Sequence, residues 1–584
     1  PKAKPQIYTY DLKTSRVKKL TSMKTGADGA TYSTSGGQIA FGTTVTDEQP
    51  SAHINFTAAG FKPKKAQRTS DVRTINTMHF QANGAGEVDK FHQHIWVMNA
   101  DGSHPRALTS GHEWSEGNAA WSPDDKTIAF NSLRRDDPAG GPNDIYTIPS
   151  AGGTMKRMNA TDPANNGPAY AHHGSALWYF AGGFEDPAEF ASLVTSAADG
   201  SNRREVVAKN TVAWGDSLIA DMKEGGGFCG PWFTADDRFM IMNIEGPGYS
   251  KLVKMNTADG TTTDLTAAQG ESYACSASAD GKTVAYMHGD ALHPAEIYVL
   301  NTDNAQPRRL TSMNVAYIGS VQLSKPEQIN VKDSAGFTVQ AWFMPAIGGK
   351  PGDKHPTILN IHGGPQTQFG ETFFHELQYF AGLGFNVVFS DPRGSTGHGY
   401  AFEEGLVHHW GDAMFEDTSR VMDEVIKRPD VDSTRLGVMG GSYGGYATLW
   451  VIAHTDRYKA AIAERVVSNL MSESLVADFA SSNGLGLTYD WGMPWDPKNT
   501  LMEQSPLTYA DKVHTPVLIL HGTEDTRTPI DQTLQEFSAL KILGRSTQFV
   551  EFPGENHDLS RTGSPIHRVE RLHILSDWMK QHLR

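Results

Sequence analysis

The first half of the chain alternates short apolar runs with polar turns that are rich in glycine and aspartate. One phrase recurs: a strand ends in an Asp-Gly-type turn, and a Leu-Thr strand end follows. Copies of this phrase begin at Ile7, Ile95, Leu252 and Ile297. A second phrase, a Ser- or Thr-opened turn before another strand, occurs at Ser33, Ser122, Thr234 and Ser278. Apolar alternation bounded by such turns predicts antiparallel strands.

The spacing of the two phrases predicts a β-propeller over residues 1–322. A period of roughly 40 residues is typical of one four-stranded blade per copy, and the stretches 118–158 and 272–312 are the clearest copies. About six blades can be recognised, and we expect about seven. A β-sandwich is the alternative, but it would not repeat its turn phrase at this spacing. Residues 44–90 lack a clear strand pattern and are expected to form a long insertion.

A different pattern runs over residues 323–584. Fully apolar strands are expected at 358–361, 385–389, 436–439, 516–520 and 549–552. Helices are expected at 415–427, 444–454, 530–543 and 565–582. This alternation predicts parallel βαβ units in a doubly wound, mostly parallel sheet. The active site of such a domain lies beyond the carboxyl ends of its strands.

Composition excludes several classes of protein. The 584 residues carry 51 basic and 66 acidic side chains, a net charge of −15, which argues against a nucleic-acid partner. No apolar run approaches the roughly 20 residues that span a bilayer, so a soluble protein with no membrane partner is expected. The sequence leaves a homo-oligomer open. The chain begins at Pro1 without a methionine, so the compartment stays open between the cytoplasm and, if a leader was removed, the periplasm or exterior.

The two cysteines, Cys229 and Cys275, are too few for a disulfide scaffold or a four-cysteine zinc site. They could pair in an oxidising compartment, but we expect buried free thiols. No H-E-x-x-H motif is present. We therefore expect neither a metal nor another cofactor.

The motif Gly440-Gly441-Ser442-Tyr443-Gly444-Gly445 supplies a candidate nucleophile. An apolar strand leads into it and a helical run follows, the setting of the nucleophile elbow in α/β-hydrolases. Gly440 and Gly444 meet the demand for small residues around the strained serine. The turn would expose the Ser442 hydroxyl at a helix N-terminus, where the dipole favours developing negative charge. A plain glycine-rich turn is the alternative interpretation.

A serine nucleophile needs a base that an acid orients, and in this fold the chain order is serine, acid, histidine. Asp525 follows the 516–520 strand, and His557 follows the 549–552 strand. We therefore predict a catalytic triad of Ser442, Asp525 and His557. Glu524 and Asp558 are alternatives for the acid, and His557 could instead be a surface histidine.

The oxyanion hole requires two backbone donors. One should be the N–H of Tyr443, directly after the nucleophile. The other should come from the loop after the 358–361 strand, which reads His362-Gly363-Gly364-Pro365. We predict the Gly364 N–H, with Gly363 as the alternative.

These residues resemble the prolyl oligopeptidase family of serine peptidases, and within it the acylaminoacyl-peptidase-like branch. The resemblance rests on five phrases: His362 to Pro365, Asp391 to Gly397, Gly440 to Tyr446, His521 to Pro529, and Gly554 to Arg561. It supports Asp525 over Glu524 as the acid. With the propeller, it extends over nearly the whole chain.

The resemblance implies further properties. Family members place the propeller as a cap, so that only short or unstructured peptides reach the triad. Arg527 matches a position that helps to hold the substrate, and the segment 464–470 is similar to the wall of the S1 pocket. There Val467 and Leu470 would favour hydrophobic P1 residues. Arg527 could instead be only an ion-pair partner, and Val467 only part of the core.

Two features depart from the family pattern. The chain opens in what looks like the second half of a blade, which leaves the closure of the propeller open. The phrase after the 385–389 strand usually reads Asn-Pro-Arg-Gly, whereas here it begins with Asp391.

The leading functional hypothesis is a serine peptidase that cleaves short peptides through an acyl-enzyme and releases acylated amino acids from blocked N-termini. A dipeptidyl peptidase or oligopeptidase is the close alternative; the former needs acidic side chains for a free α-amine, which the sequence does not place. A carboxylesterase could use the same triad but has no need of a propeller cap. An inert hydrolase on a propeller scaffold conflicts with an intact triad.

Overall fold

The chain divides into two compact units. The computed structural model describes residues 4–46, 74–134, 143–158, 165–173, 176–182, 186–223, 227–350, 352–480 and 491–584. One unit comprises Pro1–Phe180 and Thr195–Arg203, and the other comprises Ala181–Val194 and Arg204–Arg584. Among the described residues, no helix is long and apolar enough to cross a membrane.

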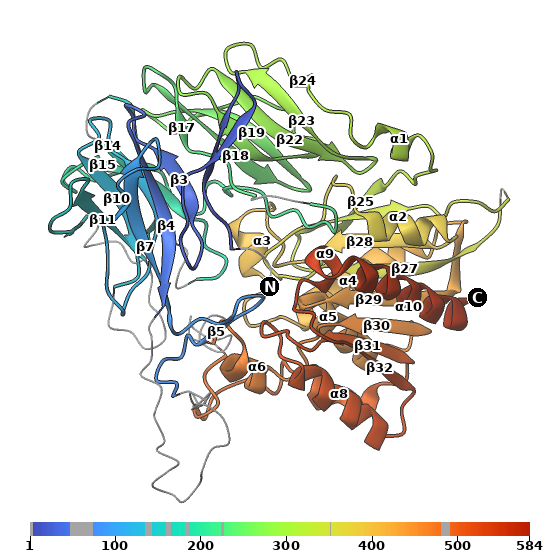
Figure 1. Ribbon diagram of the computed structural model, residues 1–584. Coiled ribbons are helices and arrows are strands. Elements are labelled where there is room, and N and C mark those ends of the chain that lie inside the picture. Colours follow the sequence, from blue (N-terminus) through green and yellow to red (C-terminus); the bar gives the residue numbers. More distant parts are fainter. Residues whose placement is uncertain are drawn as a thin grey trace, which may run out of the picture. The chain divides into compact units, whose positions relative to one another are not determined.

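The described strands between residues 28 and 309 include five four-stranded sheets (Figure 1). In four of these sheets all neighbouring strands are antiparallel. Their strands are β3 (Asp28–Tyr32), β4 (Gln38–Thr46), β7 (Phe91–Asn99) and β8 (Arg106–Ala107); β9 (Glu116–Trp121), β10 (Thr127–Ser132), β11 (Asp144–Pro149) and β12 (Lys156–Arg157); β17 (Trp232–Phe233), β18 (Phe239–Gly246), β19 (Tyr249–Asn256) and β20 (Thr262–Asp264); β21 (Glu271–Ala277), β22 (Thr283–Asp290), β23 (His293–Asn301) and β24 (Arg308–Arg309). The fifth sheet contains β13 (Asn165–Tyr170), β14 (Ala176–Ala181), β15 (Ser192–Ala197) and β16 (Arg204–Val207).

The repeated phrases of the sequence correspond to repeated hydrogen bonds. At Ser278 the hydroxyl donates to Asp280 Oδ1 (2.6 Å) and accepts from the Thr283 N–H (2.9 Å). Ser122 and Thr234 form the same turn with the aspartate two residues later. The threonine of each Leu-Thr end accepts the N–H of the residue that opens its copy, as in the pairs Thr21–Ile7, Thr109–Ile95, Thr266–Leu252 and Thr311–Ile297. Each phrase therefore closes one hairpin.

The expected count of seven blades is not what the described residues form. They contain five four-stranded sheets, and the Ile7 copy of the phrase belongs to a two-stranded sheet of β1 (Tyr8–Asp11) and β2 (Arg16–Lys19). The phrase marks one hairpin, so counting phrases overestimates complete four-stranded sheets. The insertion expected at 44–90 separates β4 from β7. Its residues 47–73 lie outside the described part, and the rest includes the hairpin of β5 (Gln81–Ala82) and β6 (Gly86–Glu87).

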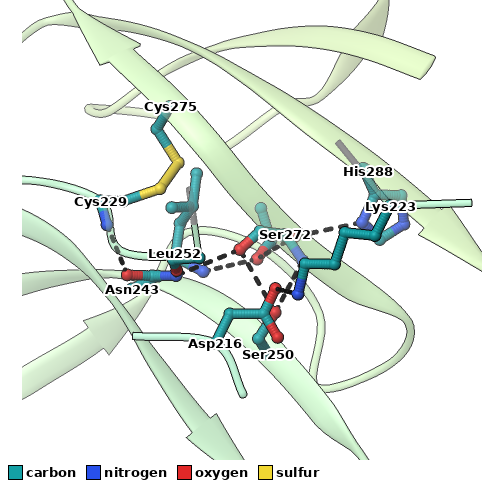
Figure 2. The surroundings of a disulfide bond; sticks show 11 residues. Asp216, Lys223, Cys229, Asn243, Ser250, Leu252, Ser272, Cys275 and His288 are labelled. Atoms are coloured by element: carbon teal, nitrogen blue, oxygen red, sulfur yellow. Dashed lines mark hydrogen bonds and ion pairs between the residues drawn. A yellow bond between two sulfur atoms is a disulfide. The ribbon is translucent and has the colours of Figure 1, made fainter. Parts of the chain in front are cut away.

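The expectation of free thiols is wrong. Cys229, just before β17, and Cys275, on β21, form a disulfide with their Cα atoms 5.3 Å apart, so the bond joins two neighbouring four-stranded sheets. Figure 2 shows Asn243 beside it, whose Oδ1 accepts the Cys229 N–H (2.8 Å). A bridge needs Cα atoms within about 4.4–6.8 Å, and only the fold brings residues 46 apart in sequence to that distance.

The second half of the chain forms one eight-stranded sheet in the order β25-β26-β28-β27-β29-β30-β31-β32. Its strands are β25 (Glu327–Lys332), β26 (Thr338–Met344), β27 (His355–Ile361), β28 (Asn386–Asp391), β29 (Val431–Gly441), β30 (Ala460–Glu464), β31 (Val517–Gly522) and β32 (Thr547–Phe552). The pairs β25–β26 and β26–β28 are antiparallel, and all the others are parallel. This is the mostly parallel sheet that the apolar runs predicted.

Helices cover both faces of this sheet (Figure 1). They are α2 (His375–Gly382), α3 (Tyr400–Glu404), α4 (Asp412–Val425), α5 (Tyr443–His454), α6 (Leu470–Val476), α8 (Asp531–Ile542), α9 (Leu559–Thr562) and α10 (Pro565–Leu583), with the 3₁₀ turn η1 (Pro506–Lys512). Val517 and Ile519 pack with α4, α5 and α8, whereas Leu518 and Leu520 pack with α2 and α10. Strands buried on both faces read as continuous apolar runs, because successive side chains point to opposite faces.

The change of sequence pattern near residue 322 falls in a connection between the two kinds of sheet. β24 ends at Arg309, the short helix α1 (Val315–Ile318) follows, and β25 begins at Glu327. The boundary between 322 and 323 stays a prediction, because the compact units divide the chain elsewhere.

Candidate active site

Ser442 lies at the turn between strand β29 and helix α5. β29 pairs on both sides, with β27 and β30, so its carboxyl end is in the middle of the parallel part of the sheet. Ser442 has φ 63° and ψ −125°, a conformation that non-glycine residues rarely adopt. Its N–H donates to the Glu464 carbonyl (3.0 Å), and its carbonyl accepts the Tyr446 N–H (3.0 Å). The sharp turn directs the serine away from the strand at the N-terminus of the helix.

Two glycines make this turn possible. A Cβ on Gly444 would meet the carbonyl oxygen of Ile361, on the adjacent strand, well inside van der Waals contact. A Cβ on Gly440 would collide with the same oxygen and with the Gly444 backbone. Backbone atoms cannot give way as a flexible side chain can, so both positions require glycine.

His557 and Asp525 meet beyond the carboxyl ends of β31 and β32. His557 Nδ1 lies 2.7 Å from Asp525 Oδ2. Asp525 Oδ1 also accepts the N–H groups of Arg527 (2.9 Å) and Thr528 (3.0 Å). The carboxylate is thus fixed by its own loop while it faces the imidazole.

The two alternative acids have other environments. The Asp558 carboxylate pairs with the Arg561 guanidinium. The N–H of Glu524 donates to the Glu555 carbonyl (2.9 Å). Of the three candidate acids, Asp525 is the one that the structure shows hydrogen-bonded to His557.

The pKa values of the pair move in the directions that proton transfer requires. Burial alone would raise the pKa of Asp525, but hydrogen bonds from His521 and His557 outweigh it and hold the pKa of Asp525 well below its usual range. Burial lowers the pKa of His557 below 6.5, although Asp525 opposes this effect. A neutral imidazole beside an ionised carboxylate can accept a proton near neutral pH.

His521 is a member of this cluster that the sequence analysis did not single out. It lies 3.4 Å from Asp525 Oδ2 through Nε2, which also contacts the Thr528 carbonyl (2.7 Å). Its Nδ1 contacts Thr533 Oγ1 (2.7 Å) on α8. The feature of the sequence that could have indicated a role for His521 is its position at the end of an apolar strand.

Ser442 and His557 line a common cavity of about 620 Å³ in the second unit. The predicted site residues Tyr443, Gly364, Val467 and Arg527 also line it. Leu470 does not; it is fully buried in the core with α5 and α8. The fold thus brings most of the predicted residues to one space and places Leu470 behind it.

The loop after β27 runs close to Ser442. A Cβ on Gly363 would lie 3.2 Å from the Ser442 Cβ, and the Gly363 carbonyl accepts the Thr367 hydroxyl (2.5 Å). Asp391, the departure from the family pattern, accepts the Phe369 N–H (2.7 Å) and lies 3.2 Å from His398 Nε2. Its carboxylate therefore holds the continuation of this loop against β28.

Arg527 is bound to Asp478, at 2.6 Å through Nε and 3.1 Å through Nη2. Its guanidinium also lies 5.7 Å from the centroid of the Phe479 ring. About half of the side chain stays exposed. The ion pair is thus present, and the guanidinium still borders the cavity.

A buried group of charges that sequence reasoning missed forms another part of the cavity. Arg571 of α10 lies 2.7 Å from Glu376 Oε2 and is bonded through Nε and Nη2 to Glu464. One guanidinium is thereby shared by two buried carboxyl groups. The three residues come from α2, β30 and α10, so no local motif could reveal them.

Three comparisons relate the chain to known proteins. A model of the prolyl oligopeptidase family matches residues 371–584. The chain is 30% identical over 590 residues to the uncharacterized peptidase YuxL of Bacillus subtilis, covering 99% of this chain and 86% of that protein. It is 28% identical over 240 residues to the acylamino-acid-releasing enzyme of Mus musculus, covering 40% of this chain and 33% of that protein.

The chain belongs to the prolyl oligopeptidase family. It is therefore a serine-type peptidase, and it resembles the acylaminoacyl-peptidase branch of the family. A solved structure of Pyrococcus horikoshii acylaminoacyl peptidase superposes with a TM-score of 0.80 at 21% identity, over 99% of this chain and 85% of that one. This likeness identifies the fold as a propeller-type domain together with an α/β-hydrolase domain, as the sequence predicted apart from the number of blades.

Proposed function

We propose that this family member is an acylaminoacyl peptidase, which releases acylated amino acids from the blocked N-termini of short peptides. In this proposal Ser442 is the nucleophile, His557 the general base and Asp525 the residue that orients the imidazole. The backbone N–H groups of Tyr443 and Gly364 hold the oxyanion, and Arg527 and Val467 contact the substrate.

One observation carries the proposal. A buried histidine hydrogen-bonded to a buried aspartate lines the same cavity as a serine at a strained strand–helix turn. A neutral imidazole beside an ionised carboxylate is the arrangement that activates a serine hydroxyl. The likeness to acylaminoacyl peptidases supports the choice of substrate.

The reaction proceeds in two acyl-transfer steps. The Ser442 oxygen attacks the scissile carbonyl while His557 takes the hydroxyl proton, and the negative charge of the tetrahedral intermediate lies against the two N–H donors. The C–N bond breaks, and His557 gives its proton to the leaving amine. A water molecule, deprotonated by His557, then attacks the acyl-enzyme and releases the acylated amino acid.

The alternative within the family is a dipeptidyl peptidase. The dipeptidyl-peptidase 5 of Porphyromonas gingivalis is 28% identical over 273 residues, which is 45% of this chain and 39% of that protein. Such an enzyme needs a free α-amine on its substrate, whereas the proposed activity needs that amine to be acylated.

Matched chromogenic substrates test the proposal. We expect acetyl-alanyl p-nitroanilide to be hydrolysed with a kcat/KM at least about tenfold above that of alanyl-alanyl p-nitroanilide. The reason is that the α-amine of its alanine is acetylated, as the proposed activity requires. The Ser442→Ala variant supplies the background rate. Hydrolysis of alanyl-alanyl p-nitroanilide but not of the acetylated substrate would assign a dipeptidyl peptidase. Hydrolysis of p-nitrophenyl acetate but of neither p-nitroanilide would assign an esterase.

A further inference from the structure

Four acidic residues line the cavity, and they differ in what holds their carboxyl oxygens. Asp221 accepts hydrogen bonds from two backbone N–H groups at the start of α2, at 2.8 and 2.9 Å. Glu376 and Glu464 share the guanidinium of Arg571. Glu473 is the exception, because neither of its carboxyl oxygens has a hydrogen-bond partner in the part of the chain that the structure describes.

The surroundings of Glu473 do not compensate its charge. The residue lies on α6 with 0% of its surface exposed. Burial, together with the carboxylates of Asp525, Asp531 and Asp478, raises its pKa well above 4.5. Arg527 acts in the opposite direction, but its guanidinium is already bonded to Asp478. Among the residues that the structure describes, Glu473 therefore has no cation of its own.

A buried carboxyl group without a partner is costly, and an apolar residue of similar size would fill the same space at lower cost. Such a group is tolerated when it stays protonated until a cation arrives and is then paired in the ionised form. Because Glu473 borders the cavity, the cation can come from a bound molecule.

The location of Glu473 relates it to the scissile bond. α6 begins three residues after Val467, which lines the cavity together with Ser442. Phe479 and Trp410 line the same space, so a long side chain would have apolar surface along its stem. A lysine or arginine side chain combines such a stem with a charged end.

We propose that Glu473 is a specificity-determining residue that binds an organic cation of the peptide substrate, namely the ammonium or guanidinium group of a basic P1 side chain. This rests on the proposed function, since it assigns a substrate class to the same cavity. It also revises the hydrophobic P1 preference that the resemblance implies. Apolar residues contact the stem of the side chain, and the carboxylate contacts its end.

A peptide can present an ammonium group in a second place, at its free α-amino group. The experiment therefore needs three arms: acetyl-lysyl p-nitroanilide, acetyl-norleucyl p-nitroanilide, and alanyl-norleucyl p-nitroanilide. Norleucine retains the stem of lysine without the charge. The free-amine arm carries a cation only at the N-terminus.

The test compares the wild type with Glu473→Gln, which keeps the shape of the side chain and removes its charge. We expect kcat/KM for the lysine substrate to fall roughly tenfold to a thousandfold, as it does when one partner of a buried charge pair is removed. The norleucine substrate should stay within about twofold. The inhibition constant of benzamidine, an organic cation, against fluorophosphonate labelling should rise at least about tenfold.

Glu536→Gln is the matched control. Glu536 on α8 is also fully buried with both carboxyl oxygens unpartnered among the described residues, and it does not line the cavity. Its variant should leave the ratio of lysine to norleucine turnover unchanged. A shift in that ratio equal to that of Glu473→Gln would overturn the proposal.

The other outcomes are also decisive. An equal loss on lysine and norleucine, or no loss on either, overturns the inference. A selective loss confined to alanyl-norleucyl p-nitroanilide assigns the cation to the N-terminus and overturns the side-chain assignment. Hydrolysis of acetylated substrates without charge selectivity leaves the proposed function standing, whereas failure of every acetylated substrate refutes that function instead.

Discussion

The polar residues at the carboxyl ends of β29, β31 and β32 contact very different partners from the polar residues in the turns of the four-stranded sheets. In the turns, a serine binds an aspartate two residues away, as Ser278 binds Asp280. At the sheet ends, Asp525 is hydrogen-bonded to His557, which lies 32 positions later in the chain. The two residues belong to different loops. Local contacts stabilise one hairpin each, whereas long-range contacts hold a geometry that only the complete sheet can supply. The two regions should therefore respond oppositely to substitution.

The largest expected effect is the loss of chemistry in Ser442→Ala. Removing the nucleophile should lower kcat/KM by about 10⁴–10⁶-fold and abolish fluorophosphonate labelling. The melting temperature should change little, because the hydroxyl fills no core position. As the matched turn variant, Ser278→Ala should keep full activity and lose about 1 kcal/mol of stability. Retained labelling of Ser442→Ala would show that another residue is the nucleophile.

The next effect concerns the glycines of the two regions. Gly444→Ala places a Cβ against the Ile361 carbonyl and must shift the serine turn, so kcat/KM should fall by about 100-fold or more. In the four-stranded sheet β9–β12, Gly117 has space, since its nearest neighbours would lie 4.0 Å from the added Cβ. Gly117→Ala should therefore preserve both activity and melting temperature. Equal behaviour of the two variants would contradict the steric explanation.

The disulfide allows the contrast between the two regions to be tested by measuring stability and activity together. Replacing both cysteines with serine should lower the free energy of unfolding by about 2–4 kcal/mol, because the 46-residue loop is no longer closed in the unfolded chain. The value of kcat/KM should stay within about twofold. Denaturant unfolding with and without a reductant measures the effect. A wild type whose unfolding is insensitive to reduction would argue against the bond.

The smallest effect is the pH dependence. His557 must be unprotonated to accept the serine proton, and burial lowers its pKa below 6.5. The value of kcat/KM should therefore be flat just above pH 6.5 and should fall about tenfold per pH unit below the pKa of the His557–Asp525 pair. A midpoint above 6.5 would show that Asp525 outweighs burial.

Much of the second half of the chain could be predicted, because its strands are buried on both faces and read as apolar runs. Three strands of the sheet were not predicted. Two are β25 and β26, which pair antiparallel at its edge. The third is β30, Ala460–Glu464, whose alanines give no strand signal although it lies next to β29. The order serine, acid, histidine also pointed to the residues that the fold brings together. In the first half the repeated phrases predicted hairpins correctly, but not how many complete sheets they form.

The remaining features depend on distances that sequence does not encode. The pairing of Cys229 with Cys275 requires two sheets to be placed side by side. Glu473 reads in the sequence as an ordinary charged residue of a short helix, and only its burial distinguishes it. Asp391 could be noticed as a departure, but its hydrogen bond to the Phe369 N–H appears only in three dimensions.

The position of Arg571 has a consequence for how this part of the chain folds. Its guanidinium is shared by Glu376 and Glu464, yet it belongs to α10 and lies 107 positions after Glu464. Before α10 packs against the sheet, these two buried carboxyl groups lack the guanidinium, and a buried charge without a partner is costly. We therefore expect the docking of α10 and the formation of this wall of the cavity to occur together.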